Sequence, residues 1–282
     1  MKRPSGPIRT FGLGAELRKL REEAGLSLKA AAAELDKSES WLSRSETGDR
    51  SIGVDDVSAL LSVYGVRGSD HERLLMMARN LTSSTWWTAS VFEIPAQLAA
   101  FQTLEARATR ITMAAVALVP GLLQTVEYAR ALVDALEVPS EDRPHRVSLR
   151  IGRQIILSQE PRKDFVAYLD EAVLHHMVGG RDVIRTQLLT LLDRSKEPNI
   201  TIRAVPFSRG AHTLLDGSFT LFEFSSTTPV CYLEERRGSG AFFHEVQDVE
   251  AFEEAAIKLD AVAADEGETR SIIERRVEEL DV

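Results

Sequence analysis

Apolar residues recur at helical spacing through the first eighty positions of the chain. Leu13, Leu17 and Ala24 share one face of a helix, and Gly25 follows as the residue type that most often ends one. Positive charges and prolines without a periodic apolar pattern precede this segment, which predicts a flexible basic arm over residues 1–10. The spacing predicts helices at 13–24, 27–35, 38–47, 54–64 and 70–79.

The second and third predicted helices each begin at a serine. Ser27 and Ser38 suit the cap position, because a serine hydroxyl accepts a hydrogen bond from a backbone N–H that the first helical turn leaves unpaired. Two short helices joined by a short turn form the helix-turn-helix, whose second helix fits the major groove of DNA. The pattern therefore predicts a recognition helix at 38–47, with Trp41 and Ser45 on its inner side.

The periodicity changes after residue 80. The stretch NLTSSTWWTAS (80–90) has no helical period and many hydroxyl side chains, which indicates a boundary. Beyond it, helix-like and strand-like segments alternate, which is typical of an α+β fold with one mixed sheet. We expect a DNA-binding domain at 1–80, a linker at 81–94 and an effector and dimerisation domain at 95–282. Helices are expected at 95–110, 125–137, 145–158, 180–194, 248–263 and 267–280, and strands at 112–118, 164–170, 199–205, 218–224, 229–234 and 241–246.

Charge is distributed unevenly between these two parts. The chain has a net charge of −9, but residues 1–80 hold 13 Lys and Arg against 12 Asp and Glu, so the acidic excess lies in the remainder. A nearly neutral module binds nucleic acid when its basic groups share one face, because phosphate contacts depend on local geometry. Cys231 is the only cysteine, which excludes an internal disulfide and predicts a small buried side chain.

The apolar stretches of the sequence are short. None approaches the ~20 residues that cross a bilayer, and no charged-then-apolar signal segment opens the chain. We therefore expect a cytoplasmic protein with no membrane partner.

Several residues of the second half have side chains suited to catalysis or metal binding. Asp170 and Glu171 are adjacent carboxylates, which we interpret as ion-pair partners of nearby arginines. His175 and His176 are neighbours, so on a helix their rings point apart instead of toward one metal ion. His212 lies in a glycine-flanked loop, where it either faces a cavity or stabilises the loop through a hydrogen bond. Because no hydrolase, protease or nucleotide-binding motif is present in the sequence, we expect no catalysis, no metal and no cofactor.

The first part contains the motifs LRKLREEAGLS (17–27), SESWLSRSETG (38–48) and VSALLSVYGV (57–66). Together these motifs resemble the XRE (Cro/repressor-like) DNA-binding domain. The resemblance implies a five-helix bundle like that of lambda repressor, in which Arg21 pairs with Glu46 and fixes the third helix against the first. It also implies that the recognition helix presents its outer residues to the groove. The DNA-contact candidates are Ser27, Lys29, Ser38, Glu39, Ser40, Trp41, Ser43, Arg44 and Arg50.

Three positions depart from the usual pattern of that family. Leu28 stands where a phosphate-contacting glutamine is usual, Ser45 replaces a buried isoleucine or leucine, and Glu39 places a negative charge near phosphates. We therefore expect a modest DNA affinity for each subunit. A homodimer on two half-sites about one helical turn apart then reaches specific affinity.

The second half carries a resemblance of its own. Its motifs include VPGLLQT (119–125), LDEAVL (169–174), VPFSRGAH (205–212) and GSFTLFEF (217–224), and they are similar to the WhiJ-like group of actinobacterial helix-turn-helix regulators. The resemblance implies a regulator with an effector-type C-terminal domain, often encoded beside a small acidic partner protein in an antitoxin-like arrangement.

Two functions remain open at this point. The first is a transcriptional regulator that binds double-stranded DNA as a homodimer and receives a small-molecule effector on its sheet. The second is an antitoxin-like protein-interaction module that mainly binds a small acidic partner. The two tryptophans at the boundary either stack on bases or pack the first part onto the second, and we favour the packing. The candidates for lining a ligand site are Trp86, Trp87, Arg203 and His212.

Overall fold

The structure is a computed structural model that describes residues 8–79, 81, 86–88, 94–135, 141–234 and 240–281, with the side chains of 86–88 and 94–95 left out. The chain divides into two compact units. The N-terminal unit comprises residues 1–107 and 234–245, and the sheet unit comprises residues 108–233 and 246–282. The expected division at residues 80 and 94 stays a prediction.

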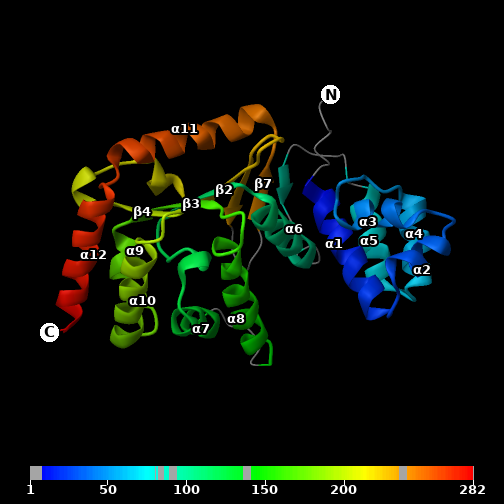
Figure 1. The fold of residues 1–282 in the computed structure, drawn as a ribbon, viewed down its shortest axis with the longest axis horizontal. Coiled ribbons are helices and arrows are strands. Elements are labelled where there is room, and N and C mark those ends of the chain that lie inside the picture. Colours follow the sequence, from blue (N-terminus) through cyan, green and yellow to red (C-terminus); the bar gives the residue numbers. More distant parts are fainter. Residues whose placement is uncertain are drawn as a thin grey trace. The chain divides into compact units, whose positions relative to one another are not determined.

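Five helices make up the first part of the N-terminal unit, as the apolar spacing predicted (Figure 1). The first helix begins earlier than expected, because Ile8 and Thr10 are buried and extend its packed face into the predicted basic arm. Residues 1–7 of that arm lie outside the described part of the chain. The helices are α1 (Ile8–Glu23), α2 (Leu28–Ala33), α3 (Glu39–Glu46), α4 (Val54–Val63) and α5 (Ser69–Arg79).

The N-terminal unit also contains a sixth helix and two short strands. The helix α6 (Ile94–Arg107) packs along α1. Strand β1 (Trp86–Thr88) pairs antiparallel with β7 (Gly240–Phe243), an element that the boundary prediction missed. The side-chain amide of Gln97 on α6 bonds to both backbone groups of Gly240, which ties α6 to β7.

A mixed sheet forms the centre of the sheet unit, and its strands lie in the order β6-β5-β2-β3-β4. Strands β2, β3 and β4 run parallel to one another, β5 pairs antiparallel with β2, and β6 pairs antiparallel with β5. Strand β3 is buried at every position after its first, which explains why its sequence is apolar without alternation. The α+β fold with one mixed sheet is therefore confirmed. The strands are β2 (Arg110–Ala115), β3 (Asp164–Asp170), β4 (Ile200–Val205), β5 (Phe219–Glu223) and β6 (Val230–Glu234).

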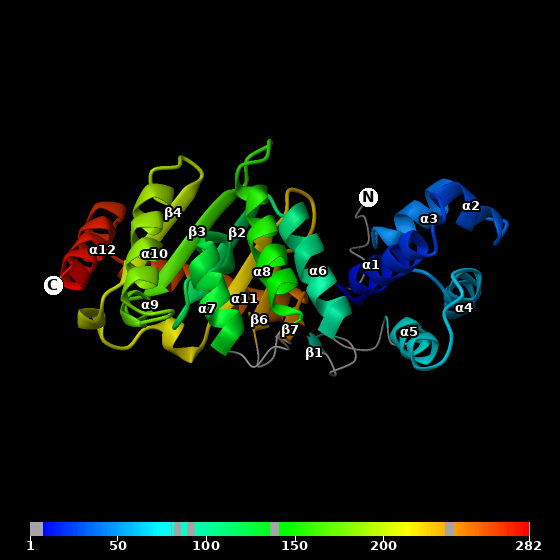
Figure 2. The same cartoon turned by 90° about the horizontal axis from the view of Figure 1, so that it is seen from below.

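Helices cover both faces of this sheet (Figure 1). Figure 2 shows α7 (Val126–Ala135), α8 (Arg143–Gly152) and α10 (Arg181–Arg194) crossing one face, where α9 (Ala172–His175) also lies. The opposite face carries α11 (Val246–Val262). The last helix, α12 (Glu266–Asp281), packs against α10 and against the edge strand β4.

Two details of the sheet unit bear on the sequence predictions. The helix expected at 145–158 divides into α8 and a turn of 3-10 helix at Arg153–Leu157. Cys231 on β6 is fully buried, as predicted.

None of the helices in the described ranges combines the length and the apolar character that a bilayer crossing requires.

Candidate nucleic-acid interface

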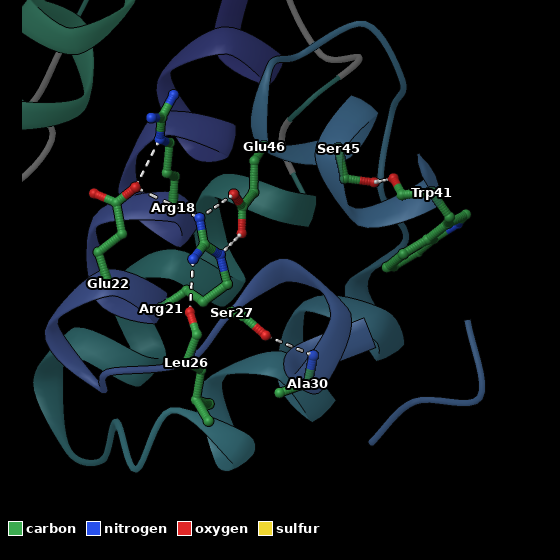
Figure 3. Close-up of polar contacts among 9 residues, drawn as sticks. All are labelled: Arg18, Arg21, Glu22, Leu26, Ser27, Ala30, Trp41, Ser45 and Glu46. Carbon is green, nitrogen blue, oxygen red and sulfur yellow. Dashed lines mark hydrogen bonds and ion pairs between the residues drawn. The ribbon is translucent and has the colours of Figure 1, made fainter. Parts of the chain in front are cut away.

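Serine caps begin both helices of the helix-turn-helix. The hydroxyl of Ser27 accepts a hydrogen bond from the backbone N–H of Ala30 at 3.1 Å, a contact drawn in Figure 3. The hydroxyl of Ser38 accepts one from the N–H of Trp41, also at 3.1 Å. Both serines have extended backbone and are exposed, so α2 and α3 begin at the surface with defined ends.

The outer side of α3 is polar and open to solvent. Glu39, Ser40 and Arg44 are exposed, and Ser43 is half-buried. The Nε of Arg44 donates to the backbone oxygen of Ser40 at 3.2 Å, which directs the side chain along the outer face. Within the part of the chain that the structure describes, the guanidinium has no carboxylate partner, so its remaining N–H groups are available to an anion.

Trp41 differs from the expectation for an exposed or groove-facing residue, because its side chain is only 7% exposed. Its place on the inner side of α3 is confirmed. Two cations lie over the ring, with the Nζ of Lys37 5.4 Å and the guanidinium carbon of Arg50 5.9 Å from the ring centroid. Cation–π attraction holds these charges at the two ends of α3. Lys37 also pairs with Asp56 at 3.6 Å, and the sequence interpretation did not single it out.

The structure contains the ion pair between Arg21 and Glu46, drawn in Figure 3. The Nε donates to Oε1 at 2.7 Å and Nη2 donates to Oε2 at 3.0 Å, and the side chains are 8% and 3% exposed. A third bond runs from Nη1 to the backbone oxygen of Leu26 at 2.7 Å. The hydrogen bond to the Glu46 carboxylate raises the pKa of Arg21 above its ordinary value, so the pair is a charged clamp between α1 and α3.

A close approach of backbones complements this clamp. A Cβ atom on Gly14 of α1 would lie 2.5 Å from the backbone oxygen of Ser45 and 2.6 Å from that of Glu46, so only glycine fits there. The Ser45 side chain is fully buried, and its hydroxyl donates to the backbone oxygen of Trp41 at 3.0 Å. The hydroxyl of Ser45, which stands where an apolar residue is usual, therefore has a hydrogen-bond partner, and this bond offsets part of the cost of burying the hydroxyl.

The remaining DNA-contact candidates lie on the same unit. Lys29 on α2 and Arg50 beyond α3 are both exposed. Their contact with DNA stays a prediction, as does that of the other candidates.

Arg203 and His212, the ligand-site candidates whose side chains the structure describes, do not line the same cavity. Arg203 lines a cavity of about 410 Å³ beside strands β2 to β4 and the start of α12, together with Tyr168 and Asp260. Its guanidinium also caps the end of α11, because Nε and Nη2 donate to the backbone oxygens of Ala264 and Ala263, each at 2.8 Å. Among the described residues, His212 is not part of that lining. Trp86 and Trp87 have described backbones on β1, but their side chains lie outside the described part of the structure.

His212 takes part in a buried pair instead. Its Nε2 lies 3.3 Å from Oδ2 of Asp170, and the side chains are 4% and 6% exposed. The neighbouring Glu171 accepts a hydrogen bond from the N–H of Phe207 at 2.7 Å and lies 3.7 Å from Nε2 of His175. The expectation that the two carboxylates pair with arginines is wrong for the described residues. Asp170 meets His212 from the loop after β4, and Glu171 meets His175 from α9, which directly follows β3. The expected loop-stabilising contact of His212 fits this geometry.

Comparisons with known proteins match both units. A helix-turn-helix domain model matches residues 12–74, which begin within α1 and end within α5. A family described as a domain of unknown function, DUF5753, matches residues 98–275, well over half of the chain. No curated protein and no solved structure matches the sequence. The helix-turn-helix match indicates a DNA-binding regulator. The chain belongs to the DUF5753 domain family and carries a helix-turn-helix domain before that region.

Proposed function

We propose that this protein is a sequence-specific transcriptional regulator of the XRE type, similar to the WhiJ-like actinobacterial group, that places α3 in the major groove of DNA. One observation carries the proposal. The helix is capped at Ser38, exposes Ser40 and Arg44 on its outer side, and is fixed at its other end by Glu46. A helix held this firmly presents the same side chains to every base pair that it meets.

The outer side chains divide between bases and phosphates by their chemistry. Ser40 and Ser43 donate or accept hydrogen bonds at base edges, and Arg44 forks onto a guanine or a phosphate. The groups that meet the DNA backbone carry a positive charge or a capping hydroxyl whose O–H can still donate to a phosphate, and they lie at the ends of α2 and α3. They are Ser27, Lys29, Lys37, Ser38 and Arg50.

We propose further that the protein acts as a cytoplasmic homodimer. Glu39 adds a negative charge to a small contact surface, so one subunit binds weakly and two half-sites are needed. The sheet unit supplies the dimer contact and receives a small-molecule effector, for which the cavity beside Tyr168 and Arg203 has a suitable size. The effector switches the output by binding the DNA-competent state more tightly than the other state. The role is regulatory, without catalysis, metal or cofactor.

Genomic footprinting tests the DNA-binding function. The tagged wild-type protein is compared with a Ser40→Ala/Arg44→Ala double variant, which removes a hydroxyl and a guanidinium from the outer side of α3. The control is Arg18→Ala, since Arg18 is an exposed arginine of α1 whose ion-pair partner among the described residues is Glu22. We expect enriched sites for the wild type and for the control, and loss of those sites for the double variant. Absence of enriched sites for the wild type contradicts the function.

The antitoxin-like alternative gives a different result. Binding to DNA falls steeply as salt rises and falls further on Arg44→Ala, because released counterions contribute to the affinity. A protein that mainly binds a small acidic partner keeps its partner in pull-downs after the Arg44→Ala change and shows no enriched DNA sites.

A further inference from the structure

Arg107 connects the last turn of α6 to the end of the recognition helix. Its Nη2 donates to the backbone oxygen of Thr47, the C-terminal cap of α3, at 2.8 Å. Its Nη1 donates to Oδ1 of Asp49 at 2.8 Å, and its guanidinium carbon lies 4.9 Å from the centroid of the Phe11 ring. One side chain from outside the helix-turn-helix therefore makes three contacts around the residues that follow α3.

The chemistry of this contact suits the end of a helix. The last carbonyls of a helix carry partial negative charge, so a cation stabilises them. An arginine fork bridges a carbonyl and a carboxylate in a fixed geometry that a lysine does not reproduce. The hydroxyl of Thr47 donates to Oδ2 of Asp49 at 2.7 Å, so the turn is already held in the shape that Arg107 binds. Gly48 between them has a φ of +74° and lies against Phe11, which leaves the turn little freedom.

The chain passes directly from Arg107 into the sheet unit. Ala108 is buried, and its backbone oxygen accepts a hydrogen bond from Nζ of Lys163 at 2.7 Å. The N–H of Thr109 then bonds to the backbone oxygen of Glu223 at 2.9 Å, and β2 begins at the next residue. Only Ala108 and Thr109 separate Arg107 from the central strand of the sheet. The side chain that holds the end of α3 is therefore joined to the first strand of the sheet unit by a connection of two residues.

We propose that Arg107 is a positioning residue for DNA recognition. It fixes the C-terminal end of α3. The affinity for specific DNA therefore depends on whether α6 holds Arg107 against Thr47 and Asp49. The inference rests on the proposed DNA-binding function and deepens it, because it assigns the regulation of α3 to one contact. Arg107 itself does not touch DNA in this account.

The test compares binding to two DNA probes. The specific probe is the 20-bp duplex that the full-length wild-type protein selects most strongly from a random library, and the other is a duplex of scrambled sequence. The variants are Arg107→Gln, Arg107→Lys and, as the matched control, Arg143→Gln. Arg143 pairs with Asp134 at side-chain exposures of 37% and 50%, against 34% and 51% for Arg107 and Asp49, so the control removes the same charge from a similar pair.

We expect Arg107→Gln to weaken binding to the specific probe about tenfold, because a misplaced α3 loses part of its base readout. Arg107→Gln weakens binding to the scrambled probe less than about twofold, since the phosphate contacts remain. The control Arg143→Gln weakens binding to that probe by the same factor. Arg107→Lys behaves like Arg107→Gln, because the charge alone does not bridge Thr47 and Asp49. An Arg107→Gln/Asp49→Asn double variant loses no more specificity than Arg107→Gln alone.

The outcomes separate this inference from the function on which it rests. If the wild type selects no sequence from the library, the proposed function fails. If the wild type selects a sequence and Arg107→Gln keeps the wild-type ratio of specific to scrambled affinity, the positioning role fails and the function stands. Full recovery by Arg107→Lys overturns the inference as well, because it assigns the effect to charge. Thermal unfolding of each variant confirms that the compared proteins are folded.

Discussion

The substitution Glu46→Gln tests the clamp that holds α3 against α1. It keeps the size of the side chain and removes its charge. The guanidinium of Arg21, 8% exposed, is then left with the 3.5 Å contact to the exposed Glu22 as its carboxylate contact among the described residues. Breaking a buried ion pair by removing one partner costs about 3–5 kcal/mol. The amide of the glutamine still accepts one hydrogen bond, so we expect the lower end of that range, about 3 kcal/mol. That loss is a large share of the ~5–15 kcal/mol that stabilises a typical domain.

The double substitution Arg21→Met/Glu46→Leu removes both charges of the pair and keeps the packing of α3 against α1. Replacing a buried pair by apolar side chains of similar volume is often neutral, so this variant regains most of the lost stability. It does not regain all of it, because the backbone oxygen of Leu26 loses its bond to Arg21, which is worth about 1 kcal/mol. Glu23→Gln is the control, since Glu23 is 59% exposed and pairs with Lys19 at the surface.

Hydrogen exchange of the full-length protein, followed by mass spectrometry, measures this effect locally. Peptides that cover α1 and α3 report the opening free energy of the bundle, which global unfolding of a chain with two units does not isolate. The reasoning is refuted if Glu46→Gln changes that free energy by less than about 1 kcal/mol. It is also refuted if the double variant is as unstable as Glu46→Gln.

Three further predictions concern Gly14, Trp41 and Cys231. Gly14→Ala forces a methyl group to within 2.6 Å of two backbone oxygens of α3, so the unfolding free energy falls by about 1–3 kcal/mol in urea titrations. Trp41→Leu removes the ring that holds two cations, so the slope of log affinity for DNA against log salt becomes shallower by about one to two units. Burial raises the pKa of the Cys231 thiol, so a thiol-reactive dye at pH 8 labels the native protein only as it unfolds.

The sequence predicted the elements of the fold well where one pattern dominates. Caps at Ser27 and Ser38 and the apolar run of β3 each have one structural interpretation, and the structure follows them. The strand at Trp86 was missed because three residues carry too little pattern, and its pairing partner Phe243 lies far along the chain. The early start of α1 was missed because prolines and charges before Ile8 conceal the periodicity.

The candidate site was predictable only in part. Arg21 and Glu46 were found through a family pattern, and spacing alone does not show that they meet. The sequence did not predict Lys37 as a site residue, because the lysine lies over the face of the Trp41 ring and that contact forms only when α3 is packed. The sequence did not predict the contact of Arg107 either, because the arginine lies 58 positions from its partner Asp49. Long-range contacts between charged side chains leave no periodic signal in a single sequence.

The central claim is that the outer side of α3 enters the major groove. Ser40→Cys places an exposed thiol there, and the native Cys231 is buried, so a DNA-cleaving chelate attaches at one position. The account predicts cleavage inside the selected duplex, centred on the major groove of each half-site, and none from Ser62→Cys on the exposed side of α4. Protection of the duplex by the protein without cleavage from position 40 would contradict it.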